Sequence, residues 1–229
     1  MTDPWPYLQA AASDFRFLLS RGYPRGAALS LVGNRYGLPH TARQLLHRGV
    51  FAPVLAAARR VKLRRLAEMP GQPLAVDGHN VLITLECALR RLPLVAADDG
   101  FIRDVGQVSR AFKVSPATDR VLILLADYLA GHHTGPLEVF YDAPLSLSGE
   151  LARRTMAVWA ARGLAVTARA VPVPERELVS FSGLVATSDT AVIDACAGVV
   201  DLAGEIIRQH PDWPVIDLRE ENAGEGEVS

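Results

Sequence analysis

The stretch Leu74–Leu85, LAVDGHNVLITL, decides the fold expected of this chain. It is apolar at both ends and is interrupted by the polar residues 77–80, DGHN. A buried parallel strand has this pattern when it carries one carboxylate to its C-terminal end and then passes into a helix. Ligands of open α/β sheets bind beyond that edge. The stretch therefore predicts a central strand that ends in a candidate functional acid, Asp77, although an aspartate here would also serve as a plain helix N-cap.

Strand and helix patterns alternate on the C-terminal side of this stretch. Residues 98–100, DDG, predict a hairpin-like turn. Alternation of strands with helices predicts the α/β class: a three-layer α/β/α domain with a mainly parallel sheet, spanning residues 71–220 and followed by an acidic tail at 221–229. Further strands are expected at 137–141, 164–171, 184–187 and, as a short edge strand, 214–218, with helices at 118–129, 148–162 and 190–209.

The first 70 residues have a different pattern and predict a small all-helical domain. Helices are expected at 14–20, 26–36, 41–48 and 53–68. The first two are short and flank a tight turn that contains Gly22, an arrangement that resembles a helix-turn-helix. A compact packing unit without a nucleic-acid role is the alternative interpretation.

Charge is distributed unevenly between these two parts. Residues 1–70 hold 11 Lys and Arg against 3 Asp and Glu, a net charge of +8, whereas residues 71–229 hold 13 against 22, a net charge of −9. A basic block can attract a polyanion, and an acidic block can hold cations. In the helix expected at 53–68, basic side chains that simply face solvent are the simpler explanation. However, no acid lies among these basic residues to form i,i+4 pairs, which favours an anionic partner. The side chains expected to contact nucleic acid are Arg43, Arg59, Arg60, Lys62, Arg64 and Arg65.

Cysteine usage and hydropathy bear on the compartment. Cys87 and Cys196 lie in apolar patterns without the spacing of a zinc site or a disulfide framework. No apolar run approaches the length of a membrane-spanning helix, and the N-terminus lacks the pattern of a secretory leader. We expect a cytoplasmic protein that is not associated with a membrane.

Acids follow three of the expected strands. Asp77 and Asp142 come directly after apolar runs, Asp189 follows the strand expected at 184–187 after Ser188, and Asp194 lies five residues beyond Asp189 in the next helix. A parallel sheet aligns its strand ends, so these acids are expected to converge. Two carboxylates about 4 Å apart repel by about 4 kcal/mol at an effective dielectric near 20, which favours a bound cation. Mg²⁺ or Mn²⁺ suits such ligands, and phosphodiester hydrolysis is the chemistry that these ions support.

Three segments carry a family resemblance. VDGHNVLIT (76–84), VFYDAP (139–144) and VATSDTAVID (186–194), in this order, resemble the DGYN-type, FDA-type and TSD-type segments of the PIN-like nuclease superfamily, particularly its NYN branch. The chain as a whole also resembles the DUF434 family, in which a basic helical domain precedes a PIN-like domain.

The resemblance implies a metal-dependent ribonuclease and a set of site residues. Asp77, Asp142 and Asp189 match the acids of the three motifs, Asn80 matches the asparagine of DGYN, and Asp194 matches a fourth acid position. His79 stands where the tyrosine is usual. A further metal ligand is expected mid-chain; Asp104 is preferred, with an ion pair to Arg103 or Arg110 as its alternative role, and the other candidates are Glu86, Asp98 and Asp99.

The leading hypothesis is therefore an endoribonuclease that uses Mg²⁺ or Mn²⁺ in an acidic crevice and binds RNA, structured or single-stranded, through its basic helices. The alternative is a catalytically inactive nucleic-acid-binding regulator whose sheet domain is a scaffold, for example for a homodimer. A phosphatase of the haloacid-dehalogenase type is disfavoured, because that chemistry needs an acid two residues after Asp77, where this chain has His79.

Overall fold

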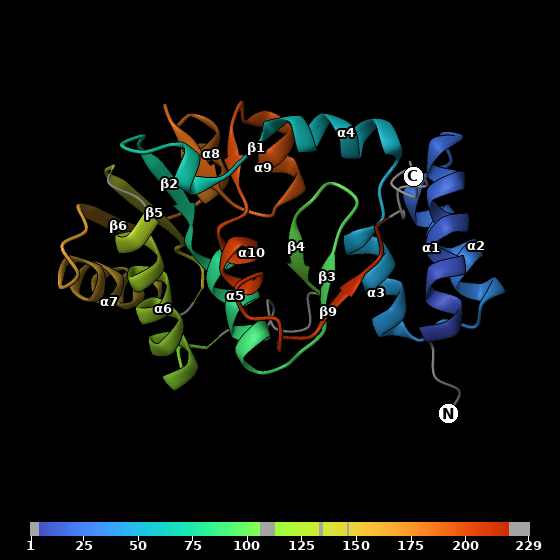
Figure 1. Ribbon diagram of the computed structural model, residues 1–229, viewed down its shortest axis with the longest axis horizontal. Coiled ribbons are helices and arrows are strands. Elements are labelled where there is room, and N and C mark those ends of the chain that lie inside the picture. The colour runs from blue at the N-terminus through green and yellow to red at the C-terminus, as the bar shows by residue number, and fades with distance from the viewer. Residues whose placement is uncertain (1–4, 106–112, 133–134, 146, 220–229) are drawn as a thin grey trace, which may run out of the picture.

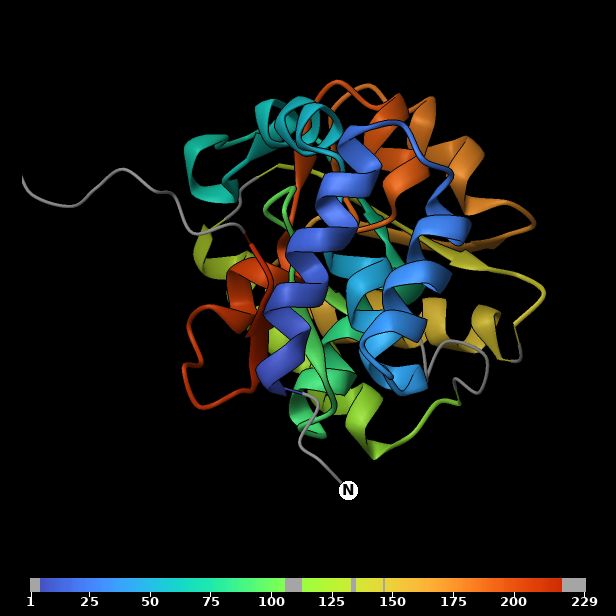
Figure 2. The same cartoon turned by 90° about the vertical axis from the view of Figure 1, so that its right-hand side faces the viewer.

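A computed structural model describes residues 5–105, 113–132, 135–145 and 147–219. Three parts lie side by side: a group of helices that contains the N-terminal segment, a small sheet in the middle, and a larger sheet with its covering helices (Figure 1). Figure 2 views the molecule from the side of the N-terminal helices, which stand in front of the sheets. Within the described ranges, no helix combines the length and apolar character that crossing a membrane requires.

The larger sheet has six strands in the order β1-β8-β7-β2-β5-β6, and every neighbouring pair is parallel. The stretch quoted first forms its central strand β2 and the following helix α5 (Gly78–Leu89). The expected mainly parallel sheet is thereby confirmed. Its strands are β1 (Leu63–Arg64), β2 (Leu74–Asp77), β5 (Leu137–Asp142), β6 (Val166–Val171), β7 (Leu184–Ala186) and β8 (Val199–Val200).

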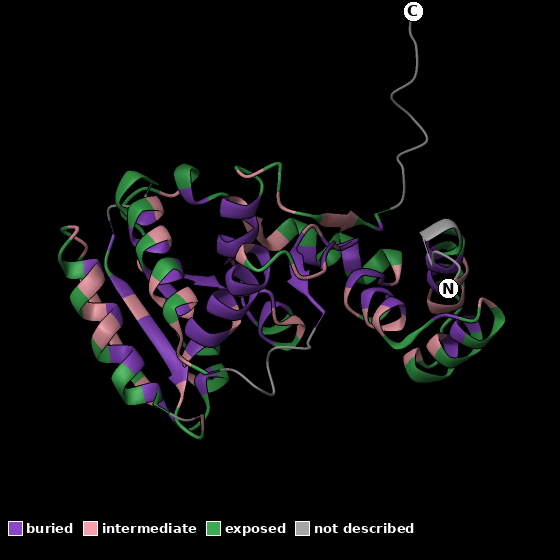
Figure 3. Ribbon diagram, turned by 90° about the horizontal axis from the view of Figure 1, so that it is seen from below, coloured by how far each residue is buried: buried purple, intermediate pink, exposed green. Residues whose placement is uncertain are grey.

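Helices cover both faces of this sheet. Successive strand residues point to opposite faces, so Val76 packs with one helical layer and Ala75 with the other. Figure 3 shows buried residues along the strands and exposed ones on the outer sides of the helices. The three-layer α/β/α arrangement is confirmed. One layer consists of α5, α6 (Pro116–His132), α7 (Ser148–Ala160) and α10 (Leu202–Ile207), and the other of α8 (Pro174–Val179) and α9 (Thr190–Ala195).

The N-terminal region is all-helical, as expected. Its helices are α1 (Trp5–Ser20), α2 (Arg25–Arg35), α3 (His40–Gly49) and α4 (Pro53–Lys62). Helix α1 begins well before residue 14, where it was expected, because Leu8, Ala11 and Ala12 add two buried turns of good helix formers. Phe15 and Leu46 pack in one core with Val95 and Leu218, so these helices rest on the small sheet.

The small sheet has the order β4-β3-β9. Strands β3 (Leu94–Ala96) and β4 (Ile102–Asp104) are antiparallel, and the turn predicted at 98–100 joins them. Strand β9 (Val215–Asp217) pairs in parallel with β3. The strand expected at 214–218 thus lies at the edge of this separate sheet and does not extend the larger one.

Two helices were predicted too long. The helix expected at 53–68 ends at Lys62; Leu63–Arg64 then pair with β8 as strand β1, and a 3-10 turn, η1, follows at Leu66–Glu68. The helix expected at 190–209 is interrupted by β8, whose valines favour a strand and pair with β7. Asp201 then starts α10 as an N-cap by accepting a hydrogen bond from the backbone N–H of Gly204.

Candidate active site

The three central strands β7, β2 and β5 bring their acids to one edge of the sheet. Asp77 is level with Phe140 on β5, and Val76 is level with Ala186 on β7. Asp142 and Asp189 therefore both lie two residues beyond the level of Asp77, on the strands that flank it. Neighbouring strands are about 4.8 Å apart. Acids that are more than a hundred residues apart in sequence are thus collected at a single rim.

Two hydrogen bonds hold the Asp77 carboxylate. Thr187 donates its hydroxyl to Oδ2 at 2.9 Å, and the backbone N–H of Asn80 contacts Oδ1 at 3.4 Å. The second contact makes Asp77 the N-cap of α5, as the simpler interpretation expected. Capping and a functional role are compatible here, because the cap uses only one carboxylate oxygen.

The electrostatic environment of Asp77 is unfavourable for a negative charge. Burial, opposed by the two hydrogen bonds and reinforced by the charges of Asp189 and Asp142, raises the pKa of Asp77 to about 7. Part of the residue stays accessible at the rim. A carboxyl group with this pKa is about half protonated at neutral pH, and a cation would be expected to displace the proton.

His79 fixes the end of β5, which carries Asp142. Its Nδ1 accepts a hydrogen bond from the backbone N–H of Asp142 at 3.0 Å, so the proton of the neutral ring is on Nε2. Burial lowers the pKa of His79 to about 4, which keeps the ring neutral at physiological pH. His79 in place of the tyrosine thus ties the start of α5 to the Asp142 strand end.

The Asp142 carboxylate is more accessible than that of Asp77. Its side chain is 41% exposed. Burial, with the charge of Glu175 at the start of α8, raises its pKa above the ordinary range. The approach of a cation from solvent is therefore open on this side of the rim.

Glycine at position 78 has a packing reason. A Cβ atom there would collide with the ring of Tyr141, whose hydroxyl shares a hydrogen bond with Thr155 at 2.8 Å. The same tyrosine ring meets His79 edge to face, with centroids 5.1 Å apart. The DGHN turn is therefore shaped by close contact with β5.

The loop after β7 positions Asp189. Its Oδ1 accepts hydrogen bonds from the backbone N–H groups of Ala191 (2.9 Å) and Val192 (3.2 Å) and so caps α9. Its own N–H donates to the hydroxyl of Thr187 at 3.1 Å. Asn80 steadies the same loop, because its Oδ1 accepts from the N–H of Ser188 at 2.8 Å and from the Ser188 hydroxyl at 3.0 Å.

Asp194 is engaged elsewhere. Arg59 of α4 donates to both of its carboxylate oxygens, at 2.7 and 2.8 Å. This bidentate contact lowers the pKa of Asp194. The structure therefore uses Asp194 to join α4 to α9 and does not direct it to the rim as a fourth metal ligand.

Three of the mid-chain acids join the N-terminal helices to the rest of the chain. Asp104, the preferred candidate, is buried; it contacts Arg48 of α3 at 3.3 Å and Thr84 of α5 at 3.5 Å, while Arg110 lies outside the described residues. The other mid-chain acids also have side-chain partners, one of which, Arg103, donates to the carbonyl of Ser188 beside Asp189 at 2.8 Å. Asp98 binds Arg16, Asp99 binds Arg59 and Arg103, and Glu86 binds Arg90 and Thr118.

The three rim acids have the donor chemistry of a hard-cation site. Asp77, Asp142 and Asp189 supply carboxylate oxygens, which Mg²⁺ and Mn²⁺ prefer. Burial is the main cause of the raised pKa of Asp77, and the charges of Asp189 and Asp142 add to it. Over the described ranges, no group of three or more His, Cys, Asp or Glu side chains is arranged to hold a metal ion. The three rim acids therefore form no closed protein cage for a metal ion.

Similarity to known sequences adds family membership to this geometry. Residues 66–205, which include all three rim acids, match the family described as "Domain of unknown function (DUF5616)". The chain belongs to this family. Residues 7–62 match a second family, "Protein of unknown function (DUF434)", as the sequence resemblance indicated. Over 202 residues the chain is 31% identical to "Uncharacterized protein MJ0935" of Methanocaldococcus jannaschii, which covers 87% of this chain and 96% of that protein. No solved structure matches this chain.

Most basic side chains near the junction with the DUF5616 domain have partners within the protein. Arg59 binds acids, and Lys62 donates to the backbone carbonyls of Ile193 and Asp194 at 3.0 and 2.7 Å. Arg43 binds the Leu38 carbonyl and Asn34. Arg60, which donates to the Asp98 carbonyl, and Arg65, whose side chain is 82% exposed, reach solvent. Arg64, which donates to the carbonyls of Val61 and Leu63, is half-buried, as are Arg43 and Lys62.

Sequence reasoning missed the hydroxyl residues of the DUF5616 site. Thr187 links the Asp77 carboxylate to the Asp189 backbone, and Ser188 links that loop to Asn80. Both are buried. In the sequence these two hydroxyl residues stand between an apolar strand and an acid, which could have indicated a role at the site. Their partners, Asp77 and Asn80, are about 110 residues away in the chain and lie at the end of a different strand, β2.

Proposed function

We propose that this protein is a divalent-metal-dependent endoribonuclease that hydrolyses phosphodiester bonds at the rim formed by Asp77, Asp142 and Asp189. The observation that carries the proposal is the convergence of these acids beyond adjacent parallel strands, where their charges help to raise the pKa of Asp77 to about 7. The resemblance of the three motifs to PIN-like, NYN-type nucleases supports the same reaction.

Mg²⁺ or Mn²⁺ bound by these carboxylates would activate a water molecule and neutralise the charge that develops on the phosphate. The other residues of the site hold the carboxylates in place. Thr187 orients Asp77, and His79 anchors the strand end that carries Asp142. Asn80 holds the loop of Asp189 through Ser188. In this assignment Asn80 is a positioning residue.

Deprotonation of Asp77 sets the expected pH dependence. Below a pH of about 7 the metal-free carboxyl keeps its proton, and cation binding must displace it. Affinity for Mg²⁺ or Mn²⁺, and with it the cleavage rate at limiting metal, is therefore expected to rise with pH through this region.

RNA is the proposed substrate and partner. The exposed residues Arg60 and Arg65 are best suited to contact the phosphate backbone, and Arg64 between them is partly accessible. Arg43, Arg59 and Lys62 contribute by holding the helices that present them. We also propose that the protein acts in the cytoplasm, where its two buried cysteines would remain as thiols.

A second candidate function is a catalytically inactive nucleic-acid-binding regulator whose sheet domain is a scaffold, for example for a homodimer. It is favoured by the absence, in the described part of the chain, of a metal-holding group with three or more ligands. Such a protein would bind RNA with a steep salt dependence but would not cleave it.

The experiment that separates the two is a cleavage assay with purified protein, Mg²⁺ or Mn²⁺, and a panel of structured and single-stranded RNAs. The endoribonuclease predicts metal-dependent internal cleavage that is lost in Asp189→Asn, a variant that keeps the helix cap because asparagine caps as well as aspartate. Asp212→Asn is the matched control, since Asp212 is exposed and pairs only with Arg91 in the described structure. Cleavage that is unchanged in Asp189→Asn, or absent from the whole panel, would overturn the proposal.

A further inference from the structure

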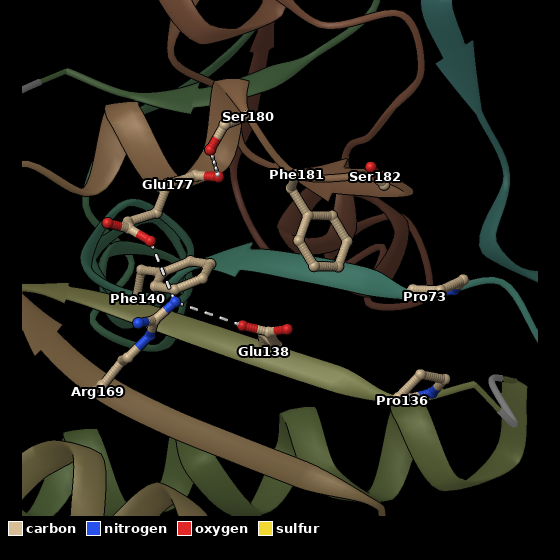
Figure 4. Close-up of a pocket in the computed structure, with 9 residues that line it drawn as sticks. All are labelled: Pro73, Pro136, Glu138, Phe140, Arg169, Glu177, Ser180, Phe181 and Ser182. Carbon is tan, nitrogen blue, oxygen red and sulfur yellow. Dashed lines mark hydrogen bonds and ion pairs between the residues drawn. The ribbon is translucent and has the colours of Figure 1, made fainter.

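A pocket of about 490 Å³ lies on the same face of the sheet as the rim acids. Strands β2, β5 and β6 form its floor, and α8 with the turn after it forms its other wall (Figure 4). Its size is within the range of small-ligand sites. The lining residues are Pro73, Pro136, Glu138, Phe140, Arg169, Glu177, Ser180, Phe181 and Ser182.

Strand register places this pocket next to the candidate active site. Asp77, Phe140 and Arg169 are level with one another across β2, β5 and β6, so their side chains point to the same face. Asp142 follows Phe140 by two residues on β5, a separation of about 7 Å along a strand. Helix α8 borders both the rim and the pocket. The charge of Glu175 helps to raise the pKa of Asp142 at the rim, and Glu177 accepts a hydrogen bond from Arg169 in the pocket.

The pocket offers flat surfaces for stacking. The Arg169 guanidinium lies over the Phe140 ring, 4.9 Å from its centroid. Phe181 lines the pocket on the side of β2, facing away from α8 toward the floor (Figure 4). Aromatic rings and guanidinium planes are the groups on which unpaired nucleobases stack.

The charges in the pocket favour a hydrogen-bond donor over a phosphate. Arg169 contacts Glu177 at 3.1 Å and Glu138 at 3.7 Å, so two carboxylates surround one guanidinium. Both carboxylates remain accessible, with side chains 39% and 41% exposed. A carboxylate can accept two parallel N–H bonds, and among the common bases only guanine presents adjacent N1–H and N2–H donors on one edge.

We propose that this pocket binds one unpaired guanine base of the RNA, next to the phosphodiester bond that faces the rim acids. The inference rests on the proposed function for its RNA context. Phe181 and the Arg169–Phe140 pair provide the stacking surfaces, and Glu177, with Glu138 beside it, accepts the guanine N–H donors. Along β5, Asp142 lies about 7 Å beyond Phe140 and about 13 Å beyond Glu138, so the base would lie one or two nucleotide steps from the acids.

The test uses nucleosides, which carry no phosphate for the rim acids to repel. Guanosine, inosine, adenosine and cytidine are titrated into the metal-free, ¹⁵N-labelled protein, and dissociation constants and shifted residues are read by NMR. Guanosine is expected to bind at least about tenfold more tightly than inosine, which lacks the 2-amino donor and leaves a carboxylate oxygen unpaired.

Variants locate the interaction. Glu177→Gln is expected to abolish the preference for guanosine over inosine, and Phe181→Leu, which keeps an apolar contact with the core, is expected to weaken all four nucleosides about tenfold. Glu68→Gln is the matched control, since Glu68 is 64% exposed on a different part of the chain. No guanosine binding, or a preference that Glu177→Gln leaves intact, would overturn the subsite.

The outcomes separate this inference from the proposed function. RNA cleavage without a guanine preference would refute the pocket assignment and leave the nuclease standing. A guanine preference that depends on Glu177, in a protein that cleaves no RNA, would support the pocket and refute the nuclease.

Discussion

The sharpest consequence of the site geometry concerns the stability of Asp77→Asn. The pKa of Asp77 is raised from 3.8 to about 7 in the folded protein. Below pH 4 the carboxyl is protonated in both the folded and unfolded states, so folding does not bury a charged carboxylate and its cost in free energy is absent. As the pH rises from 4 to 7, the unfolded chain releases this proton first, and the free energy of unfolding falls.

The magnitude follows from the shift. One pKa unit corresponds to about 1.4 kcal/mol, so a shift of roughly 3 units costs the folded state at most about 4 kcal/mol at pH 8. Because part of Asp77 is accessible, solvent screening reduces this to about 2 to 3 kcal/mol. An asparagine has the same shape and carries no charge; its one oxygen can accept from Thr187, at the cost of the longer 3.4 Å contact from the Asn80 N–H.

We therefore expect Asp77→Asn to be more stable than the wild type by about 2 kcal/mol at pH 8 without metal, and nearly equal to it at pH 4. Urea unfolding at several pH values measures the difference. Added Mg²⁺ should stabilise the wild type and leave the variant unchanged, and Asp212→Asn serves as the control. If the variant is no more stable than the wild type at pH 8, or gains the same free energy of unfolding at pH 4 and pH 8, the argument that burial and the neighbouring acids disfavour ionised Asp77 is refuted.

Three further predictions concern the residues around the site. Arg59→Met should lower the free energy of unfolding by about 3 kcal/mol, because two carboxylates lose a buried partner; an unchanged urea midpoint would contradict this. Gly78→Ala should cost about 1 to 3 kcal/mol through its collision with the Tyr141 ring, and a second substitution, Tyr141→Leu, should recover part of the loss in the same assay. Thr187→Val removes the hydroxyl that lowers the pKa of Asp77, so a ¹³C carboxyl NMR titration should show this pKa above about 7; a lower value would exclude the hydrogen bond.

Local patterns predicted much of the large sheet. The strands that begin at Leu74 and Leu137 are predicted by short apolar runs that stop at an acid, and the strand that begins at Leu184 by a run that reaches Asp189 after two hydroxyl residues. Parallel pairing then requires their ends to share an edge. By contrast, β1 and β8 are only two residues each and are defined by their pairing, so helix patterns on either side concealed them.

The sequence by itself determined the α/β class, the helical N-terminal region and the acids that terminate the central strands, because hydrophobic periodicity and strand ends are local properties. Only the tertiary structure decided which charges remain without a counter-ion. Asp194 and Asp104 meet arginines of the N-terminal helices, whereas Asp77 and Asp189 meet hydroxyl and backbone donors and the Asp142 carboxylate lies 3.9 Å from the neutral ring of His79. The reason is physical: an ion pair forms between side chains that packing brings within a few ångströms, and here the partners are 56 to 135 residues apart in the chain.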